Sequence, residues 1–318
     1  MAPLHQPGRV DVHHHAIVPA IAEIMRERKA PNYFTWTLGE TLTVMQRSHI
    51  GMAVVSNAIP FDIFGSRHAA ADAARRANDA IADLARDHPN RFSFFAAVPL
   101  PHIDLALDEA RYALDELGAA GLIVLPHGGG RYLGDPMFDP FFAELDRRST
   151  TVLVHPLHLP GTSPSDVPPV LADYLLDTTR GAISLINAES LDRFPGVTFI
   201  LAHGGGFLPY AASRVETLTS EFYGAERTRI GGYVRRFCYD LALSIPSALP
   251  TLLQVAGADH ILFGTDWCAV PEASVTRASR TLDAYELSVA DRVAIDRGNA
   301  LRILPTLAHK LAVSSHEV

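Results

Sequence analysis

The segment VTFILAHGGGFLP, residues 197–209, contains one passage from a strand into a helix. Its first half is apolar and rich in β-branched residues, which predicts a buried strand over 197–203. Three glycines then interrupt the pattern, and helical spacing from Pro209 predicts a helix over 209–221. Because a buried strand that leads directly into a helix is the repeating unit of parallel α/β proteins, this segment predicts one such unit.

The same alternation recurs along the whole chain. Eight strands alternating with helices favour a (β/α)8 TIM barrel over an open, doubly wound sheet. No linker or shift in composition divides residues 1–318, so we expect a single domain, with loop insertions after strands 1 and 5 at 16–43 and 156–169. The predicted strands are 10–13, 52–56, 92–98, 121–126, 151–155, 197–203, 237–243 and 261–266, and the predicted helices are 67–87, 105–117, 139–148, 170–192, 209–221, 246–255 and 272–284.

The composition is that of a globular protein, with 48% hydrophobic and 19% charged residues. The net charge is −8, whereas proteins that bind nucleic acids normally carry an excess of positive charge. No segment has the length of apolar chain that a membrane span needs, so we expect neither a nucleic acid nor a membrane as partner. The two cysteines, Cys238 and Cys268, lie in apolar stretches, which predicts reduced thiols and a cytoplasmic location.

The histidines and one aspartate occupy informative places. In VDVHHH, residues 10–15, the side chains of His13 and His15 point to the same side of an extended strand, because side-chain direction alternates. The fifth, sixth and eighth predicted strands end at His155, His203 and Asp266. In a barrel, the carboxyl ends of the strands surround the active-site mouth, so we expect these side chains to converge there.

A divalent metal ion would explain this collection. Neutral imidazoles and one carboxylate suit Zn²⁺, our first expectation, or Mn²⁺. Each member also has an ordinary explanation when taken alone. The His-rich stretch resembles a solvated turn or a purification tag, His155 is compatible with a strand cap, and Asp266 with a turn cap. The coincidence of all of them favours the metal.

Several motifs together resemble the amidohydrolase superfamily, and most closely its decarboxylase-rich branch, which includes aminocarboxymuconate-semialdehyde and 6-methylsalicylate decarboxylases. The resemblance spans nearly the whole chain. It is carried by VDVHHH (10–15), GRYLGDP (130–136), LVHP (153–156), LAHGGGFLP (201–209), YDLALS (239–244), ILFGTDW (261–267) and GNALRIL (298–304).

The resemblance implies a single metal ion and a set of residues that hold it. The implied ligands are His13, His15, His155 and Asp266, with His203 nearby for proton transfer. Binuclear members of the superfamily carry a carboxylated lysine at the end of the fourth strand. Here Leu125, Pro126 and His127 stand at that place, so a second metal ion is disfavoured, with His127 its only local candidate.

The resemblance also concerns the substrate. Arg214 lies eleven residues after His203, like the arginine that binds a substrate carboxylate in this branch, in some members across a dimer interface. The alternative is a helix-surface arginine paired with a nearby glutamate. The muconate-semialdehyde enzyme has another arginine before its second strand, but the register of Arg47 does not match it. We therefore expect a monocarboxylated aromatic substrate and a homodimer.

Further residues are expected around the mouth. Trp36, Phe34, Phe207 and Trp267 are candidates to contact an aromatic ring, and His158 to contact the substrate, although packing is an equally ordinary role for aromatic side chains. Asp240 is interpreted as a support for His203 or a pocket residue, or as a turn aspartate. By strand alternation, we expect His14 to have a packing or hydrogen-bonding role.

The sequence therefore predicts a metal-dependent, non-oxidative decarboxylase of a small hydroxybenzoate-type acid, with Asp266 and His203 as catalytic residues. Hydrolysis of a lactone, amide or ester at the same site is the first alternative, since fold and metal site do not determine the reaction. The second alternative is a metal-holding scaffold for binding or cyclisation.

Overall fold

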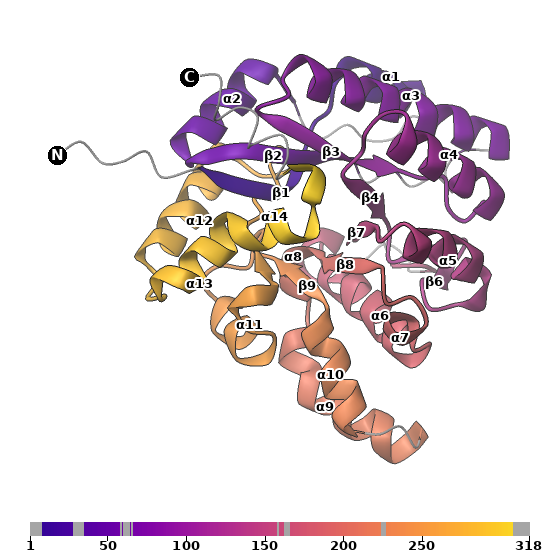
Figure 1. The fold of residues 1–318 in the computed structure, drawn as a ribbon, viewed down its shortest axis with the longest axis vertical. Coiled ribbons are helices and arrows are strands. Elements are labelled where there is room, and N and C mark those ends of the chain that lie inside the picture. The colour runs from indigo at the N-terminus through magenta and orange to yellow at the C-terminus, as the bar shows by residue number, and fades with distance from the viewer. Residues whose placement is uncertain are drawn as a thin grey trace.

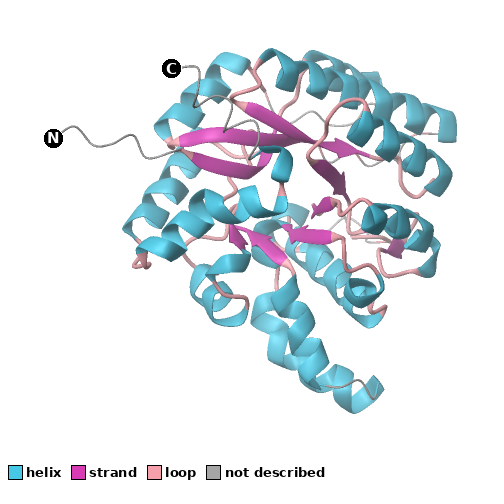
Figure 2. Ribbon diagram, viewed as in Figure 1, coloured by secondary structure: helices cyan, strands magenta, loops and turns pink. Residues whose placement is uncertain are grey.

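Eight parallel strands form a barrel at the centre of the molecule, and helices surround it (Figure 1, Figure 2). The computed structural model describes residues 8–27, 35–57, 59, 64, 66–157, 159–161, 166–223 and 227–307. Each strand pairs in parallel with the next one in this sheet. The strands are β1 (Arg9–His15), β2 (Ile50–Ser56), β3 (Phe92–Ala97), β4 (Gly121–Val124), β7 (Thr151–Val154), β8 (Thr198–Leu201), β9 (Cys238–Asp240) and β10 (Ile261–Leu262).

The barrel closes between its first and last strands. The chain beyond β10 continues alongside β1, where the Asp266 amide donates to the His13 carbonyl oxygen at 2.8 Å. A parallel bridge also joins His14 to Trp267. The predicted (β/α)8 TIM barrel is confirmed, and the open doubly wound sheet, which leaves two free edges, is wrong for this chain.

The barrel strands are buried on both faces. Every residue of β7 and all but the first residue of β8 are buried, and side chains such as Leu153 and Ile200 belong to the main hydrophobic core. This double burial explains why the strands appear in the sequence as continuous apolar runs. It also explains why an ionisable side chain at the end of such a run is informative.

Helices cover the outside of the barrel. α3 and α12 have the predicted bounds, whereas the predicted helix at 170–192 is divided because Glu189 adopts a left-handed conformation, with φ of 53°. The helices are α1 (Pro19–Glu27), α2 (Leu38–Arg47), α3 (Arg67–Asp87), α4 (Ile103–Asp115), α5 (Asp139–Arg147), α6 (Asp173–Asn187), α7 (Ser190–Arg193), α8 (Ala202–Gly205), α9 (Leu208–Tyr223), α10 (Arg227–Arg236), α11 (Leu249–Val255), α12 (Glu272–Ala284), α13 (Val289–Val293) and α14 (Asn299–Ile303).

Six strands are shorter than predicted, and the difference is largest at the last two barrel strands. The predicted strands 237–243 and 261–266 pair only over β9 and β10. Beyond them the chain turns, because Leu243 and Asp266 have positive φ angles of 55° and 63°. The residues that leave the ladder at these two places are therefore free to form the mouth of the barrel.

Some elements were not predicted. Two helices, α1 and α2, lie within or just beyond the first insertion, and a two-stranded hairpin of β5 (His127–Gly128) and β6 (Arg131–Tyr132) follows β4. Helices α9 and α10 pack side by side and project from the barrel (Figure 1). Among the helices in the described part of the chain, none is long and apolar enough to cross a membrane.

Candidate active site

β1 directs two histidines into the barrel mouth. His13 and His15 lie on the same side of the strand, as alternation requires. The ring of each is held from behind, since His13 Nδ1 lies 2.9 Å from Asp240 Oδ2 and His15 Nδ1 lies 3.0 Å from the Ser56 carbonyl oxygen. The Nε2 atoms of both histidines approach the same oxygen, Asp266 Oδ1, at 3.3 Å and 3.1 Å.

His155 completes a cluster with these three residues. It follows directly after β7, and its ring centroid lies 4.8 Å from that of His13 and 4.9 Å from that of His15. One ligand atom from each of the four residues lies within 4.8 Å of the others, and all four residues are buried. We call His13, His15, His155 and Asp266 the His/Asp group.

The His/Asp group fits a single metal ion. His13 Nε2 and Asp266 Oδ1 lie within ion-pair distance of each other, but among the described residues neither atom forms a hydrogen bond of good geometry. Both ring nitrogens of His155 also lack a hydrogen-bond partner there. Buried polar atoms without partners are costly, and one cation at the centre of the group would satisfy them. Imidazole nitrogens and a carboxylate oxygen are a donor set that Zn²⁺ and Mn²⁺ accept.

Burial and neighbouring charges set the ionisation of the group. Burial lowers the pKa of His13, but the carboxylates of Asp240 and Asp266 outweigh burial and raise that pKa to about 10. Burial raises the pKa of Asp266, but its contacts with His13 and His15 hold that pKa well below the usual range. Burial also lowers the pKa of His155. At neutral pH the group therefore contains an ionised Asp266 beside a protonated His13 and a neutral His155.

His203 lies against the group. Its ring centroid is 4.9 Å from that of His13 and 5.6 Å from that of His155. Its Nδ1 lies 3.3 Å from the Ala242 carbonyl oxygen, and its backbone amide donates to Asp240 Oδ1 at 3.1 Å. Burial lowers the pKa of His203, so its ring is neutral at pH 7 and able to accept a proton.

The glycines after His203 make its position feasible. Residues 203–206 all have positive φ angles, between 55° and 74°. A Cβ atom on Gly206 would lie 2.1 Å from the Leu175 carbonyl oxygen, and one on Gly205 would lie 2.6 Å from the Tyr239 ring. Left-handed backbone and close approach both require glycine here, which explains the GGG of the sequence.

One residue that the sequence analysis missed supports the group from below. The Asp11 carboxylate is fully buried and accepts four hydrogen bonds, two of them from Thr265. The others come from the His13 amide at 3.1 Å and from His14 Nδ1 at 2.8 Å. Asp11 thus joins the strand of His13 to the segment that leads to Asp266. Its position before the histidines in VDVHHH was the only signal in the sequence.

Comparison with known proteins identifies the family. A family model described as amidohydrolase matches residues 10–306. The chain belongs to the amidohydrolase family. A 6-methylsalicylic acid decarboxylase of Penicillium expansum is 32% identical, over 94% of this chain and 97% of the relative. A crystal structure of 2,6-dihydroxybenzoate decarboxylase complexed with 2,6-dihydroxybenzoate has a TM-score of 0.81 and 26% identity, covering 94% of this chain and all of that one.

A second relative points to the same branch of the amidohydrolases. A gamma-resorcylate decarboxylase of Rhodococcus jostii is 29% identical, over 81% of this chain and 84% of the relative. The predicted resemblance to this decarboxylase-rich branch is therefore confirmed.

The structure brings the four predicted ligand residues of this amidohydrolase together, with His203 beside them. Asp240 supports both His13 and the backbone of His203, and His14 has the predicted hydrogen-bonding role. His127 lies 3.8 Å from Asp177 Oδ1 and is not a member of the His/Asp group.

The predicted substrate residues are more dispersed. Arg214 is exposed on α9, and Phe207, just beyond the His203 turn, is 40% exposed. Trp267 is buried, and its indole nitrogen donates to Thr41 Oγ1 at 3.1 Å. Trp36 packs against the small apolar cluster that contains Trp267. Contact of these four residues with a substrate stays a prediction, and Phe34 and His158 lie outside the described residues.

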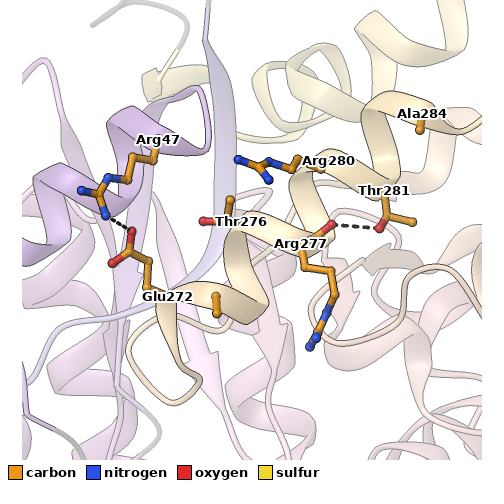
Figure 3. Close-up of a pocket in the computed structure, with 8 residues that line it drawn as sticks. Arg47, Glu272, Thr276, Arg277, Arg280, Thr281 and Ala284 are labelled. Atoms are coloured by element: carbon orange, nitrogen blue, oxygen red, sulfur yellow. Dashed lines mark hydrogen bonds and ion pairs between the residues drawn. The ribbon is translucent and has the colours of Figure 1, made fainter.

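Arg47 lies at the surface, with its side chain 62% exposed. It forms an ion pair with Glu272 at 2.5 Å across a surface groove between α2 and α12, of about 690 Å³ (Figure 3). Arg277 and Arg280 also line this groove. Arg47 is thus engaged at the outer surface, and the expectation that it does not bind a second substrate carboxylate stays a prediction.

Replacement of His13 by Ala should abolish metal binding and activity together, because His13 supplies one of the four ligand atoms of the His/Asp group. Metal content after dialysis, measured by atomic emission, checks this. His88→Ala is the matched control, since His88 caps the far end of α3 and should leave the metal content unchanged. Full metal content in His13→Ala would remove His13 from the ligand set.

Metal uptake should release protons. With a pKa of about 10, His13 is protonated at pH 7, and the metal displaces this proton. The apparent affinity should therefore rise roughly tenfold per pH unit between pH 6 and 8. Calorimetry in two buffers of different ionisation enthalpy counts the released protons. Asp240→Asn should reduce the release, and pH-independent affinity would contradict the protonated state of His13.

Proposed function

We propose that this amidohydrolase is a metal-dependent carboxy-lyase that removes CO₂ from a hydroxybenzoate-type acid without oxidation. The observation that carries the proposal is the buried His/Asp group, with a neutral His203 at its edge, in a chain 32% identical to a 6-methylsalicylic acid decarboxylase over 94% of its length. A gamma-resorcylate decarboxylase among the relatives supports the same chemistry.

The proposed cofactor is one Zn²⁺ ion, with Mn²⁺ as the alternative. The residues that would hold it are His13, His15, His155 and Asp266. Neither ring nitrogen of His155 has a hydrogen-bond partner among the described residues, so one of them is available to the ion. When bound, the ion supplies a Lewis acid for the carboxylate and phenolic oxygens of the substrate. Three imidazoles and one carboxylate favour zinc as the first choice.

Asp266 and His203 are the proposed catalytic residues. Asp266, which is ionised at rest, takes up one proton and gives it to the ring carbon that bears the carboxylate. The C–C bond then breaks, its electron pair restores the aromatic ring, and CO₂ leaves. Each turnover thus consumes one proton from solvent. We propose that His203, which is neutral and 7% exposed, accepts this proton from solvent and passes it to Asp266.

Substrate recognition is proposed for residues around the mouth. The exposed guanidinium of Arg214 on α9 is available to a carboxylate, within one chain or across a homodimer, which is the assembly we propose. Trp36, Phe207 and Trp267 are the proposed contacts to the aromatic ring, and His158 is a proposed contact to the substrate. The two cysteines are buried and unpaired, which supports a reducing, cytoplasmic setting.

The reaction class is tested with a substrate panel. Zinc- or manganese-loaded protein should release CO₂ from 6-methylsalicylate or 2,6-dihydroxybenzoate, and in D₂O the product should carry one deuterium at the carbon that lost CO₂. Lactones, esters and amides in the same assay, followed by chromatography, test the hydrolase alternative. Hydrolysis without CO₂ release would replace the proposal, and binding of the acids without turnover would favour a scaffold.

His203→Ala should keep most of the bound metal but lose about a hundredfold or more in turnover, because the proton relay is removed. Metal content and kcat measured on the same preparation separate the two effects. His203→Asn keeps much of the side-chain shape but has no titratable ring, so this variant should show a similar loss of turnover. Near-normal kcat in either variant would show that His203 moves no proton in the slow step.

A further inference from the structure

His155 differs from its neighbours in how its ring is held. The Nδ1 atoms of His13, His15 and His203 each lie within hydrogen-bond distance of Asp240, of the Ser56 carbonyl or of the Ala242 carbonyl. By contrast, neither ring nitrogen of His155 has a hydrogen-bond partner in the described part of the chain. Histidines that bind metals normally donate their second nitrogen to a partner that fixes the ring. Among the described residues, hydrogen bonds therefore hold His155 only through its backbone.

The backbone around His155 is fixed at two amides. The His155 amide donates to the Val124 carbonyl oxygen on the neighbouring strand β4 at 2.9 Å. Pro156 has no amide hydrogen, so the next donor along the chain is Leu157. The Leu157 amide donates to Asp177 Oδ2 at 3.4 Å. Asp177 on α6 thus accepts from the first backbone amide that follows His155.

The burial of the Asp177 carboxylate is unusual for a side chain on a surface-covering helix. Asp177 is fully buried, and its Oδ1 lies 3.8 Å from His127 Nε2 on the hairpin that follows β4. Burial raises the pKa of Asp177 to about 6, although His127 and Arg180 act in the opposite direction. A buried carboxyl of this kind is costly, so its position indicates a specific demand at this point of the barrel.

The surroundings of α6 place Asp177 at the mouth. One turn later on the same helix, a Cβ atom on Gly181 would lie 2.7 Å from Pro126, at the exit of β4. On the other side, Thr179 Oγ1 accepts the Phe207 amide at 2.8 Å, beyond the exit of β8. α6 therefore spans the exits of β4, β7 and β8, and Asp177 connects it to the middle one.

We propose that Asp177, supported by His127, is a positioning residue that aims His155 into the His/Asp group. It acts through the Leu157 amide, which fixes the direction in which the chain leaves β7. The inference rests on the metal site of the proposed function, but it does not depend on which reaction occurs there. Loss of the Asp177 carboxylate should therefore lower the affinity for the metal ion while the chain still folds.

The test compares variants of the full-length protein by zinc affinity, measured in competition with a chelator. Asp177→Ala should weaken zinc binding about 10- to 100-fold, the usual effect of losing a residue that orients a ligand. Asp177→Asn keeps an oxygen that accepts the Leu157 amide and should recover most of this loss. The absorption spectrum of the Co²⁺-loaded protein should change in the Ala variant and resemble the parent in the Asn variant.

Thr178→Ala is the matched control. Thr178 is the next residue on α6 and equally buried, but its hydroxyl donates to the Tyr174 carbonyl within the helix at 3.2 Å. This variant should lose thermal stability while keeping its zinc affinity. A double variant, His127→Leu with Asp177→Leu, removes the anchor without leaving an unpaired charge, so it should fold and show the same loss of affinity as Asp177→Ala.

The outcomes separate the two proposals. If the unsubstituted chain binds zinc and the Ala and double variants bind it within about twofold of the parent, the positioning role of Asp177 is overturned and the proposed function stands. If Thr178→Ala loses as much affinity as Asp177→Ala, the effect is one of general destabilisation, which also overturns the role. If the unsubstituted chain binds no metal, both proposals fail.

Discussion

The site depends on one buried carboxylate that ties the first strand of the barrel to the last. Asp11 accepts hydrogen bonds from the amide of His13, from His14 and from both donors of Thr265. A buried carboxylate is costly unless its oxygens accept hydrogen bonds. The positions of the donor groups are therefore fixed together with that of the carboxylate. As a result, two segments that are about 250 residues apart in sequence are fixed at the distance at which His13 and Asp266 face each other.

The eight strands could be predicted because a strand buried on both faces has to be apolar along its length. That rule located the strands near 151–155 and 197–203 without any knowledge of their partners. It failed most at the ends of β9 and β10, where the predicted strands run on but the backbone turns left-handed at Leu243 and Asp266. Hydrophobicity does not report the direction of the chain, so strand ends next to the site were the least predictable part of the fold.

The four members of the His/Asp group could be predicted because they lie at the ends of apolar runs. An ionisable side chain is costly in such a buried position, so its presence there indicates a function. The residues that hold them were less accessible. Asp240 was recognised only as a support, and Asp11 and Asp177 were not recognised at all, since their partners at Thr265 and Leu157 become neighbours only in the folded chain. Trp267 shows the converse difficulty, because an aromatic residue beside Asp266 has its indole bonded to Thr41 on α2.

The left-handed turn that carries His203 limits how such a protein can diversify. Gly204, Gly205 and Gly206 combine positive φ angles with neighbours closer than 3 Å to any added Cβ atom. Substitution at any of these three positions would destabilise the folded protein before it could change which substrate is preferred. A mutant library for directed evolution would therefore leave these glycines untouched and sample the longer connections after β1 and β7 instead.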